Sequence, residues 1–107
     1  MISFDEFKKL EIRIGKVVVA EKIADAQKLI KLTFDMGGET RGIVAGIADF
    51  FPDVSLLIGK EMPVMVNLEP KNFRGHTSYG MILAADVDGR PVLLHPAEDV
   101  PPGSIVR

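Results

Sequence analysis

The spacing of apolar residues changes period near the start of this chain, and the change separates two kinds of predicted element. Phe4, Phe7 and Leu10 recur at helical intervals, and Ser3 followed by Glu6 has the spacing of a capping box. These features predict a short N-terminal helix whose apolar side caps the core. From residue 12 onward the period falls to two, which is typical of strands with one buried face.

Several segments show the strand pattern. The first two strands are defined by alternating apolar positions, which are Ile12, Ile14, Val17, Val19, Ile30, Leu32, Phe34 and Met36. The glycines of MGGET predict a hairpin turn, and RGIVAGI returns as the partner strand. A short irregular or helical insert is expected over ADFFPDVSLLIGK, which Pro52 interrupts and Gly59 ends. Later strands are expected in MPVMVNL, GMILAADV and PVLLH, followed by a proline-rich tail.

This order of elements favours a small antiparallel barrel. Short strands dominate, one insert follows the third strand, and no βαβ alternation occurs. At 107 residues the chain is long enough for one hydrophobic core but hardly for two. We therefore predict one domain over residues 1–107. Its expected fold is all-β, a five-stranded OB-fold barrel with a short N-terminal helix, a helical insert after the third strand and a C-terminal extension.

Composition narrows the functional classes. Apolar residues make up 47% of the chain and charged residues 26%, which is typical of globular proteins. The absence of cysteine excludes disulfides, thiolate metal sites and cysteine nucleophiles. No apolar run approaches the roughly 18 residues of a membrane span, and the N-terminus lacks a signal-peptide core. We expect a cytoplasmic protein without membrane contact.

Charge is distributed unevenly although the net charge is only −2. Residues 8–31 contain seven basic and three acidic side chains, whereas residues 32–61 contain five acidic and two basic ones. One basic face on an acidic body would suit a polyanionic partner, although ordinary solvated charge gives the same count.

Catalytic and metal-binding patterns are missing. His76 and His95 have no second ligand at metal-binding spacing, and DVDG lacks the closing glutamate of a calcium loop. His76 and Ser78 have no orienting acid nearby, and MGGETRG lacks the spacing and lysine of a P-loop. We predict no catalytic residue, no metal and no cofactor.

The stretch NLEPKNFRGHTSYGM, residues 67–81, is much longer than the about two to five residues of a usual hairpin connection. Together with FKKLEIRIGKV and RGIVAGI it resembles the tRNA-binding OB domain family. That family includes the C-terminal domain or detached beta subunit of methionyl-tRNA synthetase, stand-alone tRNA-binding proteins and a secretion chaperone-like branch. The most specific matches are Arg74, Gly75, Ser78, Gly80 and Met81, and the tail DVPPGSIVR is most similar to the synthetase branch.

The resemblance implies that this loop and the neighbouring barrel face contact tRNA. Arg74 offers a planar fork suited to phosphate, and Lys71 offers a point charge. Asn67 and Ser78 are neutral donors for a phosphate or a ribose hydroxyl, although Asn67 also suits a turn cap. The candidate tRNA-binding residues are Lys28, Lys31, Arg41, Asn67, Lys71, Arg74, Gly75, Ser78, Gly80 and Met81. A solvated role for the two strand lysines and a core role for Met81 stay open.

The chain departs from the family pattern at three places. KIADAQKL replaces a histidine-proline segment, Ala45 stands where serine is frequent, and Glu69 stands where lysine is common. A carboxylate near a phosphate track is expected to weaken binding. Within the loop, Phe73 and Tyr79 are the only aromatic residues, which favours folded RNA over stacked single strands.

We therefore predict a non-catalytic, structure-specific tRNA-binding subunit that assists the methionyl-tRNA synthetase catalytic subunit in tRNA aminoacylation. It is expected to form a homodimer through Phe4, Phe7 and the tail from Val100 to Val106. The alternative is a secretion chaperone-like protein that binds extended peptides in a dimer groove. A purely structural assembly module is a third reading of the same sequence.

Overall fold

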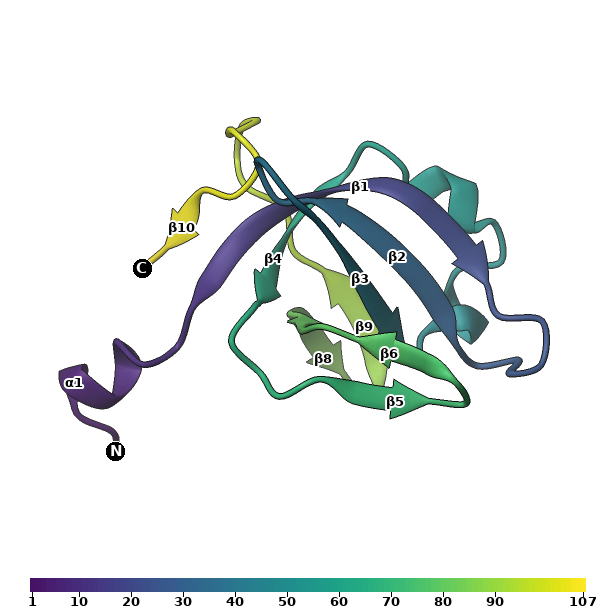
Figure 1. The fold of residues 1–107 in the computed structure, drawn as a ribbon, viewed down its shortest axis with the longest axis horizontal. Coiled ribbons are helices and arrows are strands. Elements are labelled where there is room, and N and C mark those ends of the chain that lie inside the picture. The colour runs from purple at the N-terminus through teal and green to yellow at the C-terminus, as the bar shows by residue number, and fades with distance from the viewer.

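The computed structural model describes all 107 residues, and most of its elements are antiparallel strands, which include a curled main sheet (Figure 1). In chain order the elements are α1 (Phe4–Phe7), β1 (Ile12–Lys22), β2 (Ile30–Asp35), β3 (Thr40–Ala45), η1 (Ala48–Phe50), η2 (Val54–Leu57), β4 (Glu61–Met65), β5 (Lys71–Phe73), β6 (His76–Ser78), β7 (Met81–Ile82), β8 (Ala84–Val87), β9 (Arg90–Leu93) and β10 (Ile105–Val106). None of the helices has the length and apolarity needed to cross a bilayer.

Strand β1 organises the main sheet, because its two halves pair with different neighbours. The sheet has six strands in the order β3-β2-β1-β4-β7, and β10 pairs with the start of β1. The first half of β1 pairs with β4 and the second half with β2, and a bulge lies between Val17 and Val19. A bulge bends its strand and increases the local twist, so the sheet curls into a half-barrel. The predicted OB-like all-β fold is therefore confirmed.

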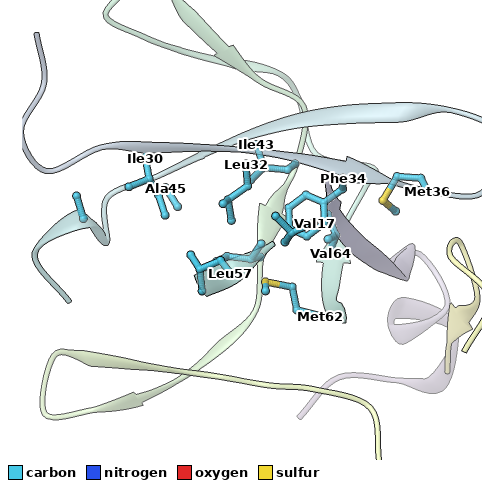
Figure 2. Packing of buried hydrophobic residues seen from close by; sticks show 12 residues of the cluster. Val17, Ile30, Leu32, Phe34, Met36, Ile43, Ala45, Leu57, Met62 and Val64 are labelled. Atoms are coloured by element: carbon cyan, nitrogen blue, oxygen red, sulfur yellow. The ribbon is translucent and has the colours of Figure 1, made fainter. Parts of the chain in front are cut away.

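The core lies inside this curl and uses the predicted period of β2. Ile30, Leu32 and Phe34 are all fully buried, and Figure 2 shows the Phe34 ring beside Val17 and Val64. Gly15 makes room for this packing, because a Cβ there would lie 2.7 Å from the Met36 sulfur and 2.8 Å from the Phe34 ring. The bulge reverses one expectation, since Val19 is 45% exposed instead of facing the core.

The free ends of the curled sheet meet at a seam beside β3. The Tyr79 amide donates to the Gly42 carbonyl at 2.9 Å. Next to it the Val44 amide donates to the Ser78 hydroxyl, which in turn donates to the Gly80 carbonyl, both at 2.9 Å. Ser78 is only 2% exposed. A buried hydroxyl and a backbone bond thus contribute to closing the barrel, in place of a continuous pair of strands.

The N-terminal helix was predicted to cap the core, and this prediction is wrong. The capping box between Ser3 and Glu6 is present, but α1 has a single turn and buries none of its residues. Phe4 is 69% and Phe7 38% exposed, and α1 lies away from the barrel (Figure 1). Helical spacing identifies the apolar side of a helix, but it does not identify the surface that covers that side.

Three further segments add detail to the expected elements or differ from them. The insert after β3, expected to be irregular or helical, consists of two short 3₁₀ helices, η1 and η2. The expected strand GMILAADV divides into β7, which joins the main sheet, and β8, which forms a separate hairpin with β9. The stretch 67–81 contains the hairpin β5–β6, whose three-residue strands are too short to show a period. The main sheet therefore has six strands in place of the five that were predicted, and two separate hairpins accompany it.

The C-terminal tail crosses the sheet and brings β10 to the same side as α1 (Figure 1). Gly103 donates its amide to the Ile14 carbonyl at 2.7 Å and accepts from Arg13 Nη1 at 2.9 Å. It adopts a φ of 90°, and a Cβ there would lie 2.2 Å from the Met36 carbonyl oxygen. Upstream, the Val100 amide donates to Oε1 of the buried Glu61 at 2.9 Å.

Candidate nucleic-acid interface

The hairpin β5–β6 presents Arg74 at its tip. Arg74 and Gly75 form the turn with φ values of 52° and 86°. Positive φ at both central positions is the requirement of a type I′ turn, which matches the twist of a hairpin. The Gly75 amide also donates to Asn72 Oδ1 at 2.9 Å, which fixes the turn. Gly75 therefore serves the turn that positions Arg74.

A second small hydrophobic cluster attaches this hairpin to the loop between β1 and β2. Ile23, Ala26 and Val44 are buried together, and Phe73 and Leu29 pack against them. Across the same contact, Arg74 Nη1 donates to the Asp25 carbonyl at 3.0 Å. The segment KIADAQKL, which departs from the family pattern, therefore supplies the apolar residues that hold the hairpin in place.

A hollow of about 600 Å³ lies between this loop and the hairpin. Lys28 and Arg74 both line it, and so does Gln27, which the sequence reasoning missed. The Lys28 carbonyl accepts the Ala48 amide at 3.1 Å, so the backbone that bears this lysine is fixed. A guanidinium has five donors, and the bond to Asp25 uses one of them. The remaining donors and the Lys28 ammonium are suited to a phosphate.

Two further predicted lysines lie outside the lining of this hollow. Lys71 is exposed at the start of β5, with its ammonium 5.0 Å from the centre of the Phe73 ring. Lys31 lies on the outer face of β2, opposite Glu21 on β1, and its stem passes over Gly42. Neither lysine forms an ion pair. The two ion pairs of the chain join Arg13 to Glu11 and Arg41 to Glu39.

Two of the predicted contact side chains form hydrogen bonds within the fold, and their contact with tRNA stays a prediction. Arg41 crosses the seam, where its Nη1 donates to the carbonyls of Val66 at 2.9 Å and Tyr79 at 3.0 Å. Asn67 binds the N-terminal segment, accepting the Glu11 amide at 2.9 Å and donating to the Lys9 carbonyl at 2.6 Å. These donors already have partners within the chain.

Ser78 and Gly80 likewise have structural roles. The Ser78 hydroxyl uses its bonds at the seam, as described above. Gly80 adopts a φ of 139°, and a Cβ there would lie 2.4 Å from the Met65 carbonyl oxygen. Close backbone approach therefore explains Gly80, and closure of the barrel explains Ser78.

Met81 begins β7 and is 37% exposed, so it is not the plain core residue that its position also allowed. It lines a second hollow of about 380 Å³ together with Leu68, Glu69, Lys71 and Phe73. Phe73 thus borders both hollows. No three side chains of the metal-ligating types gather anywhere in the chain.

Comparison with known proteins identifies the family of this fold. Residues 12–105 match the family model described as "Putative tRNA binding domain". The chain is 52% identical over 106 residues to methionine-tRNA ligase of Archaeoglobus fulgidus, and the aligned region covers 98% of this chain and 16% of the ligase. It is 46% identical over 107 residues to methionine-tRNA ligase of Methanothrix thermoacetophila, and the aligned region covers 100% of this chain and 16% of that ligase.

Two solved structures resemble the whole chain. The MetRS-related protein of Pyrococcus horikoshii superposes with a TM-score of 0.94 at 44% identity, covering 100% of this chain and 98% of that one. The chaperone CsaA of Bacillus anthracis superposes with a TM-score of 0.89 at 31% identity, covering 100% and 99%. The chain spans 16% of the length of the ligases that it matches. It belongs to the tRNA-binding domain family.

Proposed function

We propose that residues 1–107 act as a non-catalytic tRNA-binding domain. The proposed contact surface consists of the hairpin β5–β6, the loop 23–29 and the outer face of β2. The observation that supports it is that Lys28 and Arg74 line one hollow, and that Lys71 lies over the ring of Phe73, which lines the same hollow. Lys31 is the fourth cationic side chain of the proposed surface, and none of the four forms an ion pair within the chain. Unpaired cations on one surface bind polyanions by releasing counterions, and the family supplies the identity of the polyanion.

Folded tRNA is the proposed form of the ligand. Domains that hold single strands stack successive bases on exposed aromatic rings, whereas folded RNA is bound through phosphates, 2′-hydroxyls and shape. Here Phe73 is partly buried against the second hydrophobic cluster, and Tyr79 is the one largely exposed ring of the hairpin region. A single exposed ring does not provide a stacking platform.

The proposed partner is the catalytic part of methionyl-tRNA synthetase. Both ligase relatives match this chain almost end to end. In this proposal the domain adds tRNA affinity in the cytoplasm, as a separate subunit, and the synthetase performs all of the chemistry. The chain itself forms and breaks no bond.

We also propose a homodimer in which the apolar sides of α1 and β10 meet a second copy. A groove of about 650 Å³ lies between them and includes Phe4, Phe7, Ile105 and Val106 in its lining. A helix of one turn is not stable in water by itself, so a covering surface is needed. A two-fold axis at this groove would place two cationic loops on one assembly.

Binding of labelled tRNA, followed by fluorescence anisotropy, tests the function. Arg74→Ala should weaken binding by about tenfold or more, as expected for a charged donor to phosphate. Arg74→Lys should recover part of the loss. Arg90→Ala is the matched control, because Arg90 is also exposed but begins β9, in the separate hairpin β8–β9. Equal affinity in the Arg74→Ala variant and the parent would remove this hairpin from the interface.

The chaperone alternative is tested on the same samples. The likeness to CsaA supports it, so an extended, unfolded peptide is titrated beside the tRNA. The proposal expects tRNA to bind far more tightly than the peptide. Tight peptide binding that is unchanged in Arg74→Ala, together with weak tRNA binding, would favour the chaperone function instead.

A further inference from the structure

The second hollow is lined by a carboxylate, which would repel a phosphate bound there. Glu69 is exposed, forms no hydrogen bond or ion pair, and lines this hollow beside Lys71. Leu68, Phe73 and Met81 form the apolar part of the lining. Glu69 therefore keeps both oxygens free at a site that already has apolar walls and a cation.

A carboxylate repels phosphate, so the RNA groups that it attracts are hydrogen-bond donors, which are the ribose 2′-hydroxyl and the N–H groups of the bases. A 2′-hydroxyl donates one hydrogen bond, so a partner that engages both carboxylate oxygens at once is a base edge with two donors. Guanine is the standard base with two adjacent donors on its Watson–Crick edge, N1–H and the N2 amino group. Adenine, cytosine and uracil each place an acceptor beside their donor on that edge. The two oxygens of Glu69 can accept both guanine donors at once. The Lys71 ammonium is a suitable donor for the neighbouring O6.

The size of the hollow also fits one base. Its volume of about 380 Å³ is near the lower end of the roughly 300–1,000 Å³ of small-molecule sites. Loops of folded RNA offer unstacked bases, which proteins bind by their edges and by contact with aromatic or apolar side chains. The Phe73 ring and the thioether of Met81 supply such contacts, and sulfur packs favourably near ring systems.

We propose that this hollow binds one unstacked guanine of the RNA, with Glu69 accepting from N1–H and N2–H and Lys71 donating to O6. The inference rests on the proposed tRNA-binding function and deepens it. The sequence alone leads us to expect that Glu69 weakens the binding of every tRNA alike. In this proposal Glu69 instead makes the site prefer guanine over the other bases.

Mononucleotides test the base preference directly. The methyl group of Met81 is labelled with ¹³C, and its NMR shift is followed while GMP, IMP or AMP is added. IMP lacks the N2 amino group, and AMP lacks both guanine donors and O6. GMP should bind at least about tenfold more tightly than AMP, with IMP between them, because hydrogen bonds to a charged group are lost in turn. Equal shifts with all three nucleotides would overturn the guanine site.

Two variants separate this inference from the proposed function. Glu69→Gln should remove the difference between GMP and AMP, whereas Glu98→Gln, the same change at an exposed tail position, should preserve it. If tRNA binds and depends on Arg74 but Glu69→Gln leaves the GMP preference unchanged, the guanine site is wrong and the proposed function stands. If tRNA does not bind at all, the proposed function fails, and RNA as the source of the base fails with it.

Discussion

Replacing Ser78 by alanine would remove the hydroxyl that bonds the two sides of the barrel seam, while every cationic side chain of the proposed surface is kept. The hydroxyl accepts the Val44 amide and donates to the Gly80 carbonyl, and Val44 itself is fully buried. An alanine side chain fits the same space but leaves both backbone groups without a partner. The change therefore isolates the energetic role of one buried hydroxyl.

The expected cost follows from those two groups. A buried donor or acceptor left unsatisfied costs about 1–3 kcal/mol, so the two groups together should lower the free energy of unfolding of Ser78→Ala by about 2–6 kcal/mol. For a domain of this size each kcal/mol lowers the Tm by about 4 °C, so the Tm should fall by roughly 8–24 °C. The denaturant dependence should stay the same, because the surface exposed on unfolding does not change.

Urea unfolding followed by far-UV circular dichroism measures this loss. Ser55→Ala is the control, since the Ser55 hydroxyl bonds only the neighbouring Asp53 at an exposed site, and its effect should stay within about 0.5 kcal/mol. Below its transition, Ser78→Ala should bind tRNA as the parent does. Unchanged stability combined with a large loss of tRNA affinity would show that the hydroxyl contacts RNA and does not hold the seam.

Three further changes test how the termini are held. Gly103→Ala introduces a Cβ 2.2 Å from the Met36 carbonyl at a φ of 90°, so it should destabilise the protein by roughly 2 kcal/mol or more and reduce the dimer fraction in analytical ultracentrifugation. Glu61→Ala removes the acceptor of the Val100 amide and should speed hydrogen exchange at that amide, while Glu61→Gln, which retains an acceptor, should not. Asn67→Ala frees the segment that bears α1, so sedimentation should show a weaker dimer, and an unchanged dimer constant would contradict the proposed assembly.

The fold was predictable where burial follows a strict period. In β2, alternate residues Ile30, Leu32 and Phe34 are buried, as expected from the sequence. The period failed at the bulge in β1, because one extra residue moves Val19 to the outer face. It also failed for β5–β6, because strands of three residues are stabilised by turn chemistry and by packing against a distant loop.

The candidate site was predictable by residue type and less so by role. Lys28 and Arg74 line one hollow and Lys71 is exposed at the start of β5, and their contact with tRNA stays a prediction. Arg41 and Asn67 were chosen for the same polar groups that the structure uses internally. A sequence shows which hydrogen-bond donors a loop contains. Only the tertiary structure shows which of these donors are already bonded to carbonyls of the same chain.

The most direct test of the central claim is the salt dependence of tRNA binding in the parent and in a Lys28→Ala, Arg74→Ala double variant. With four phosphate contacts per copy, the log-log slope of the parent should be about −3 to −4 for one engaged copy and about −6 to −7 for two. The double variant should be shallower by about 2 for each engaged copy, because two contacts per copy are lost. A slope that stays the same in the double variant while the protein remains folded would contradict the proposed interface.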